Sequence, residues 1–244
     1  MTDKKFNSWF GSFILAGILI SVAIITYIKY DASNPRNWLL IISAIGSLAG
    51  VLSTILSANA RILTFVFGLV DVTLYGAMCL VNWYGGQSGL GNALLHFVYF
   101  VPMQFVGLWQ WRKRLTGDGR VTARRLTPSQ RWKCLLLFLG GLVIAYFILL
   151  RFDRSADSSL FRLAVVLDAL PLMFNILGQM LMSMAYMEQW FFWIGVNITS
   201  ILMWSFAGDS GYAPIYIAKY SFYLLNALNG LRIWMTLSRD DNRL

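Results

Sequence analysis

The sequence predicts an all-α polytopic membrane protein with about eight transmembrane helices. Hydrophobic residues make up 58% of the 244 residues, charged residues only 13%, and the mean hydropathy is +0.61. This composition is too apolar for an ordinary soluble domain. The hydrophobic residues form runs of about 20 residues, the length that a helix needs to cross roughly 30 Å of hydrocarbon. The runs lack the ten-residue alternation of barrel strands, so helices satisfy the backbone polar groups.

The expected helices follow one another along nearly the whole chain. The apolar runs cover residues 9–29, 38–57, 61–82, 89–111, 131–150, 160–184, 188–206 and 212–237. Some connections are very short, for example residues 57–60, so a count of seven or eight depends on where each turn lies.

The net charge of +9 is concentrated in the connection between the fourth and fifth runs. Eight basic residues lie there: Arg112, Lys113, Arg114, Arg120, Arg124, Arg125, Arg131 and Lys133. With eight spans, this connection shares a side with both termini, giving that side fourteen basic residues against five on the other. Because cytoplasmic loops retain Lys and Arg, we expect both termini in the cytoplasm. The location argues against a nucleic-acid partner, and a regulatory partner is the alternative.

The sequence contains no motif for catalysis, metal binding or coupling to ATP. Cys79 and Cys134 lie in expected helices without CxxC spacing or a histidine cluster. There is no phosphate loop of the form GxxxxGK followed by Ser or Thr. One histidine and scattered carboxylates do not make a nucleophile–base arrangement. We therefore expect no enzyme activity, no bound metal and no cofactor.

The two halves of the chain are similar at a separation of about 125 residues. Residues 67–73 lie opposite residues 193–199, and two later positions match in the same order. The matched pairs are Asp71 with Asn197, Gln104 with Asn229 and Trp109 with Trp234. Two three-helix units separated by one helix would be parallel repeats, related by an axis along the membrane normal. Chance similarity among apolar helices is the alternative.

The repeat divides the chain into five expected regions, in a 3+1+3 arrangement preceded by an extra helix. They are residues 1–37 with the N-terminal tail and extra helix, 38–113 with the first repeat, 114–159 with the basic loop and a linker helix, 160–237 with the second repeat, and 238–244 with the C-terminal tail.

The segment 188–197 contains the most distinctive candidate binding residues. Trp190, Trp193 and Asn197 have i, i+3, i+7 spacing, which places them on one helical face. Two indole rings followed by an amide suit a flat, polar ligand, whereas a helix that only contacts lipid needs Leu and Val. An interfacial aromatic belt is the alternative for Trp190.

Other polar residues within expected helices are candidates for the same site. Neutral amides in a membrane cost least when they bond each other or a ligand, and Gln104, Asn226 and Asn229 are such amides. Asp71 is an intramembrane carboxylate that must be compensated, by a cationic ligand, a proton or Lys219. His96 is a further candidate, and packing within its helix is the alternative.

These motifs resemble the PnuC family of nicotinamide riboside transporters over residues 38–237. The segments that carry the resemblance are 71–76, 104–111, 188–197 and 228–234, together with the 3+1+3 pattern. The resemblance implies a SWEET-like helix arrangement, a homotrimer and a bacterial inner (cytoplasmic) membrane. It also implies facilitated diffusion with alternating access, and trapping of the imported nucleoside by a cytoplasmic ribosylnicotinamide kinase. Asp71 departs from the family, in which Asn is frequent at this position.

A nicotinamide riboside ligand fits the candidate residues chemically. Its pyridinium ring is a cation that Trp190 and Trp193 can bind by stacking, worth about 0.5–2 kcal/mol at each favourable face. The amides would bond its carboxamide and ribose hydroxyls. Thiamine, which is also a flat cation, is an alternative substrate, and a receptor without transport is an alternative function.

Overall fold

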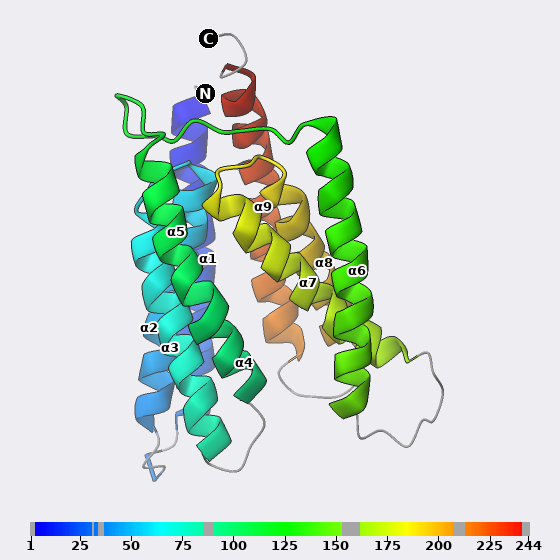
Figure 1. Cartoon of the computed structure of the whole chain (residues 1–244). Coiled ribbons are helices and arrows are strands. Elements are labelled where there is room, and N and C mark those ends of the chain that lie inside the picture. Colours follow the sequence, from blue (N-terminus) through cyan, green and yellow to red (C-terminus); the bar gives the residue numbers. More distant parts are fainter. Residues whose placement is uncertain are drawn as a thin grey trace. The chain divides into compact units, whose positions relative to one another are not determined.

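The computed structural model describes residues 3–30, 32–33, 37–84, 90–152, 162–206 and 213–240, and these residues fold into helices and their connections (Figure 1). The helices are α1 (Asp3–Lys29), α2 (Asn37–Ala58), α3 (Thr64–Tyr84), α4 (Leu90–Leu95), the π-helical segment η1 (His96–Phe100), α5 (Val101–Arg112), α6 (Pro128–Phe152), α7 (Leu163–Ser183), α8 (Gln189–Phe206) and α9 (Ala213–Asp240). Because α4, η1 and α5 follow one another without a break, the described residues form eight continuous helices. The predicted all-helical membrane fold is confirmed.

Length and composition identify membrane-spanning helices among the described residues. Six are long and apolar enough to cross a bilayer: Lys5–Ile28, Asn37–Ala58, Thr64–Val81, Ala93–Arg112, Pro128–Arg151 and Val165–Ser183. α8 contributes a shorter apolar stretch, Gln189–Met203. α9 contains three basic residues, Lys219, Arg232 and Arg239, which lower its hydropathy below that of the other helices.

The start of α6 is set by a reciprocal capping arrangement. Gln130 donates its backbone N–H to the Thr127 hydroxyl at 3.3 Å, and Thr127 donates its own N–H to Gln130 Oε1 at 2.9 Å. This is a capping box, and Pro128 at the first helical position lacks the N–H that would otherwise be unpaired. The helix therefore begins three residues before the apolar run.

The helix that contains His96 is interrupted by a π-helical turn. Val101 donates its backbone N–H to the carbonyl oxygen of His96, five residues earlier. Pro102 follows and has no N–H to continue the ladder. Such wider turns frequently occur at functional sites.

The chain divides into two compact units, each described here by itself. The first comprises residues 1–122 with 183–185, and the second comprises residues 123–182 with 186–244. In the first unit, α2 and α3 lie side by side and α5 packs on α3 (Figure 1). In the second unit α8 packs on α9, and α6 packs on α7 through Ala145, Ala169 and Met173. The helix that the sequence analysis treats as a linker between the repeats, α6, thus belongs to the second unit.

The α2–α3 and α7–α8 connections have the same backbone structure. Each contains an alanine with positive φ, Ala60 at 55° and Ala185 at 60°. The next residue donates its N–H to the carbonyl five residues earlier, Arg61 to Leu56 and Tyr186 to Leu181, both at 2.9 Å. This is the Schellman hydrogen bond that closes a helix C-terminus. The two turns give the repeat a structural separation of 125 residues.

This register corrects one pairing made from residue types. Both helices run without interruption from these equivalent turns. Counted from the turns, Asp71 aligns with Val196, and Asn197 aligns with Val72. The match of Asp71 with Asn197 is therefore wrong by one residue, because similarity of residue type does not fix where a helix begins.

In the first unit, an aromatic ring of α3 packs on a glycine of α5. Phe65 of α3 packs on Gly107 of α5, where any side chain would overlap its ring. Its ring lies edge-on to Trp111, with the centroids 4.9 Å apart. Trp111 is 0% exposed, so this cluster is part of the interior.

The second unit repeats this cluster. Trp190 of α8 packs on Gly230 of α9 and lies edge-on to Trp234, with centroids 6.3 Å apart. Both clusters use the pattern Gly-Leu-x-x-Trp, at residues 107–111 and 230–234. Trp234 therefore corresponds to the buried Trp111, and its predicted pairing with Trp109, which is 58% exposed, is wrong. The pairing of Gln104 with Asn229 rests on the same alignment and is wrong with it.

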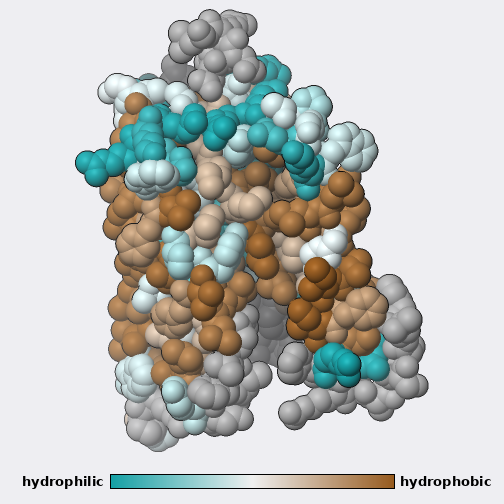
Figure 2. Space-filling model, in the orientation of Figure 1, coloured by the Kyte–Doolittle hydropathy of each residue, from teal (hydrophilic) through white to brown (hydrophobic). Residues whose placement is uncertain are grey.

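The basic segment between α5 and α6 is anchored to both turns. Val121 donates its N–H to Ala60 at 3.0 Å in the first unit, and Met187 donates its N–H to Arg124 at 2.9 Å in the second. Figure 2 shows hydrophilic side chains along this segment and mainly hydrophobic surface on the helices. Within the segment, the Thr116 hydroxyl and the Arg120 N–H hold the pKa of Asp118 below its ordinary value.

Candidate substrate-binding residues

Trp190 lies in the packed interior of the second unit. It is 3% exposed, and its indole fills the space above Gly230. Its Nε1 has no hydrogen-bond partner among the described residues. These surroundings are those of a packing residue rather than of a membrane-interface anchor.

Trp193, one turn further along α8, is half-buried and contacts α7. Its indole N–H donates to Gln189 Oε1 at 3.4 Å. The ring lies against Gly178 of α7, where an added Cβ would be 3.3 Å from the ring atoms Cδ2 and Cε2. The two tryptophans, expected on one face from their spacing, contact different helices, since Trp190 packs toward α9 and Trp193 toward α7.

Asn197 continues the same side of α8. It is 5% exposed, and its Nδ2 donates to the backbone carbonyl of Trp193 at 2.9 Å. This bond fixes the orientation of the amide relative to the Trp193 turn. Gln189, Trp193 and Asn197 therefore form one linked polar-aromatic row along α8.

The two candidate amides of α9 are also buried. Asn226 is 3% and Asn229 9% exposed. Asn229 Oδ1 accepts hydrogen bonds from Arg232 Nε at 3.2 Å and Nη2 at 3.1 Å. The carbonyl of Asn229 is therefore already engaged by a cation of its own helix.

In the first unit, Gln104 of α5 lies at the crossing with α2 and α3. It is 4% exposed and packs on Gly68, where a Cβ would lie 2.6 Å from its Oε1 and 3.1 Å from Ser53 Oγ. Gln104 Oε1 has no hydrogen-bond partner in the described part of the chain. Burial of an acceptor without a partner is destabilising, so Gln104 stays a candidate binding residue.

Asp71 lies one turn beyond Gly68 on α3 and is half-buried. A Cβ at Gly50 of α2 would lie 2.7 Å from Asp71 Oδ2, so the carboxylate packs directly on α2. Lys219, proposed as its partner, belongs to the second unit, where its Nζ is 5.6 Å from the centroid of the Tyr223 ring. Pairing of Asp71 with Lys219 stays a prediction.

His96 belongs to an aromatic cluster of the first unit. Its ring lies 4.7 Å from that of Tyr75 and 4.9 Å from that of Phe100, centroid to centroid. Its Cβ lies close to Gly76 of α3. These contacts fit packing between α3 and η1 more closely than recognition of a ligand.

The structure thus groups the candidates into two sets, one in each unit. In the first unit, Asp71 of α3 packs on Gly50 and Gln104 of α5 packs on Gly68, and in the second unit Trp193 and Asn197 are linked on α8. Among the described residues, no group of three or more His, Cys, Asp or Glu side chains has metal-binding geometry.

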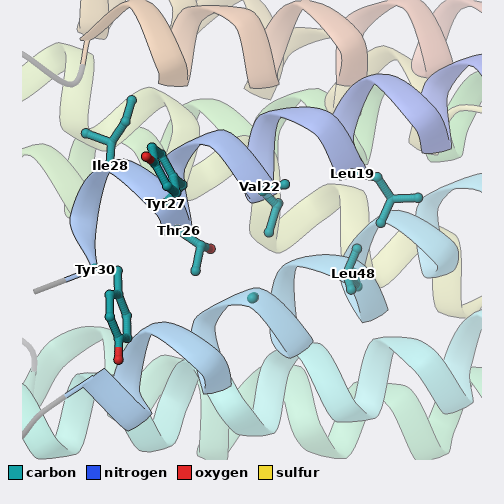
Figure 3. A pocket seen from close by; sticks show the side chains of 9 residues that line it. Leu19, Val22, Thr26, Tyr27, Ile28, Tyr30 and Leu48 are labelled. Atoms are coloured by element: carbon teal, nitrogen blue, oxygen red, sulfur yellow. The ribbon is translucent and has the colours of Figure 1, made fainter. Parts of the chain in front are cut away.

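A groove of about 890 Å³ lies elsewhere, between α1 and α2 of the first unit (Figure 3). It is lined by Leu19, Val22, Ala23, Thr26, Tyr27, Ile28, Tyr30, Ala44 and Leu48. This lining has no carboxylate or amide side chain and includes none of the candidate residues. The groove therefore does not match the polar ligand that the candidate residues suit.

Sequence reasoning missed three residues that shape these sets. Gln189 is fully buried and holds Trp193, whereas Gly68 and Gly178 give room to Gln104 and Trp193. The i, i+4 spacing of Gln189 and Trp193 was a usable signal. The two glycines carry no such signal in the sequence, because the side chains that contact them come from other helices.

Comparisons with known proteins match nearly the whole chain. The family model for nicotinamide mononucleotide transporters matches residues 40–236. The nicotinamide riboside transporter PnuC of Haemophilus influenzae is 29% identical over 228 residues, covering 92% of this chain and 91% of the relative. PnuC of Neisseria mucosa is 30% identical over 213 residues, covering 84% and 74%. A crystal structure of the vitamin B3 transporter PnuC has a TM-score of 0.65 and 25% identity, covering 98% of this chain and 94% of that one.

Proposed function

The chain belongs to the PnuC family of nicotinamide riboside transporters, and we propose that it imports nicotinamide riboside by facilitated diffusion with alternating access. The observation that carries the proposal is the half-buried indole of Trp193 on an apolar helix, whose N–H donates to Gln189 Oε1 and whose backbone carbonyl accepts from Asn197 Nδ2. An indole face attracts a pyridinium cation, and nearby amides suit the carboxamide and ribose.

Two of the helices that carry candidate residues, α3 and α8, favour the riboside over its phosphorylated form. They contain no Lys or Arg, whereas α5 ends at Arg112 and α9 contains Lys219, Arg232 and Arg239. Phosphate binding in proteins relies on such cations and on exposed backbone N–H groups. A phosphate moved into the membrane without them would pay a desolvation cost of several kcal/mol. Asp71 adds negative charge, which further favours a cationic ligand.

Facilitated diffusion stops when the nucleoside reaches equilibrium across the membrane, so continued uptake requires that the imported nucleoside be removed. Phosphorylation by a cytoplasmic ribosylnicotinamide kinase fulfils this role, because the phosphorylated product no longer fits the carrier. Because trapping by phosphorylation already sustains uptake, coupling to an ion is not needed, and we favour uniport over coupled transport.

The proposal also covers the membrane in which the protein lies and its oligomeric state. We infer an inner-membrane location in a bacterium with both termini in the cytoplasm, since fourteen basic residues lie on that side in an eight-helix topology. We also infer a homotrimer from the family resemblance.

Counterflow in proteoliposomes tests the proposed function. Vesicles that hold the purified chain are loaded with unlabelled nicotinamide riboside and diluted into a trace of the labelled compound. We expect transient accumulation of label that external nicotinamide riboside abolishes and thiamine, riboflavin and nicotinamide mononucleotide leave unchanged. Accumulation blocked by thiamine but not by nicotinamide riboside would contradict the substrate, and binding without counterflow would indicate a receptor.

A further inference from the structure

Trp193 is held on two sides within the second unit. Gln189 accepts its indole N–H, and Gly178 lies beneath its ring. Because an indole nitrogen can only donate, this contact fixes the Gln189 amide with its oxygen toward the ring and its nitrogen away.

Gln189 is an unfavourable residue for packing alone. It is 0% exposed, and its Nε2 has no hydrogen-bond partner among the described residues. Burial of a donor without a partner is destabilising. An aliphatic side chain would fill the same position without an unpaired donor.

The first unit fills the equivalent position with hydroxyl groups that are paired with each other's helix. In the 125-residue register, Thr64 corresponds to Gln189 and Ser53 to Gly178. Thr64 Oγ1 donates to the Ser53 carbonyl at 2.9 Å, and Ser53 Oγ donates to the Thr64 carbonyl at 2.8 Å. These hydroxyl groups join α2 to α3 with their donors paired.

The second unit replaces this pair of hydroxyl groups with an amide, a glycine and an indole. Trp193 itself corresponds to Gly68, so the ring is present in one unit only. The space left by Gly178 admits the ring, and the amide of Gln189 sets its direction. Compared with the first unit, the second unit has an oriented aromatic face but lacks the fully paired contact between the two helices.

We propose that Gln189 is a positioning residue that fixes the plane of the Trp193 indole for stacking on the cationic ring of the ligand. This inference rests on the proposed function, because it takes Trp193 as the stacking surface. A ring held in its binding orientation loses less conformational freedom when the ligand arrives, and the affinity rises accordingly.

A double-mutant cycle on the full chain in detergent tests the inference by titration with nicotinamide riboside. Trp193→Phe keeps an aromatic ring but removes the N–H that Gln189 accepts. We expect Gln189→Leu to weaken binding about five- to tenfold in the wild-type background. In the Trp193→Phe background the same change should weaken binding less than about twofold, because the hydrogen bond is already absent.

Stability and control variants separate positioning from a structural role. Gln189→Leu should retain the wild-type thermal stability, and Gln110→Leu, a half-buried glutamine of α5, should retain wild-type affinity. Gln189→Asn keeps an amide that is too short to reach the indole, so it should behave as Gln189→Leu. It replaces Gln189→Leu in the cycle if that variant does not fold.

Equal losses of affinity in both backgrounds, or loss of stability in place of affinity, would overturn the inference alone. Failure of the wild-type chain to bind nicotinamide riboside would overturn the proposed function and the inference with it.

Discussion

Trp190 and Trp193 differ in exposure and in their neighbours, and these differences assign them different roles. Trp190 fills the space above Gly230 and is nearly inaccessible, so its indole stabilises the contact of α8 with α9. Trp193 packs on Gly178 but is only half-buried, so part of its side chain remains exposed. We therefore propose Trp193, rather than Trp190, as the indole that stacks on the ligand.

Alanine substitution of each tryptophan should separate stability from binding. Trp190→Ala should lower the free energy of unfolding by about 3–5 kcal/mol, because it leaves a cavity beside Gly230. Trp193→Ala should leave the fold intact and weaken nicotinamide riboside binding about five- to thirtyfold, through the loss of a cation–π face. Thermal unfolding and ligand titration of both purified variants measure the two effects. A Trp193→Ala variant with normal affinity would contradict the site assignment.

Asp71 provides a charge-specific test of ligand recognition. Its carboxylate lies against Gly50 within the membrane helices, where Coulomb attraction is stronger than in water. Asp71→Asn should weaken binding of cationic nicotinamide riboside about tenfold if the carboxylate faces the pyridinium ring. The reduced riboside, whose ring is uncharged, should bind both forms equally well.

The exposed loop carboxylate Asp118 supplies the control for that experiment. Asp118→Asn removes the same charge from the chain but should change neither affinity. Equal weakening of the charged and uncharged ligands by Asp71→Asn would instead indicate a structural or neutral hydrogen-bonding role.

At the residue scale, the sequence identified the buried polar groups but not their directions. Gln104, Asn197, Asn226 and Asn229 were predicted from amides inside apolar runs, and all four are less than 10% exposed. That Asn229 is engaged by Arg232 could not be foreseen, because the i, i+3 contact depends on rotamers. Gln189 was overlooked because it opens its helix, where polar residues are ordinary.

At the scale of helices, glycines determine how closely two of them approach. Gly107 and Gly230 each receive an aromatic ring from the preceding helix of the repeat, Phe65 and Trp190. Neither ring can move far, because each is also packed edge-on against a buried tryptophan. A methyl group at either glycine must therefore separate the helices.

Glycine-to-alanine substitutions measure this requirement. Gly107→Ala and Gly230→Ala should each lower the free energy of unfolding by about 1–3 kcal/mol through overpacking. Gly140→Ala on α6 is the matched control, since an added Cβ there has no neighbour within 4 Å among the described residues. The control should be neutral or stabilising by up to about 1 kcal/mol from helix propensity. Unfolding of the three variants in one detergent gives the comparison, and equal stabilities would show that the rings relax freely.

The helices themselves were predictable because hydrocarbon thickness fixes the length of an apolar run. The repeat register was not, because it depends on the αL residues Ala60 and Ala185. Glycine normally signals such a turn, and alanine gives no such signal. The shared Gly-Leu-x-x-Trp pattern was the better guide, but only the buried packing of Trp111 and Trp234 shows that it carries structure.

For the whole molecule, charge is distributed unequally between the helices and their connections. Basic residues gather in the segment between α5 and α6, whereas α2, α3, α7 and α8 have none. Glu188 helps to anchor that segment, since its carboxylate accepts the Leu126 N–H at 3.1 Å and lies 3.4 Å from Arg131. Apart from Lys219 and Arg232 of α9, positive charge thus lies mainly in the connections and near the helix ends.

This distribution predicts strong discrimination against phosphate. Nicotinamide mononucleotide should bind at least about 100-fold more weakly than nicotinamide riboside, because its phosphate would be desolvated without a matching cation. A riboside methylated at the 5′-oxygen serves as the size control, since it enlarges the same position without adding charge, and it should bind far better than the mononucleotide. Competition titrations of the three ligands on the purified chain measure the order.

Comparable affinity for riboside and mononucleotide would mean that a cation reaches the ligand, and Lys219 and Arg232 of α9 are the candidates. The carrier could then return phosphorylated product to the outside, and trapping by a kinase would fail.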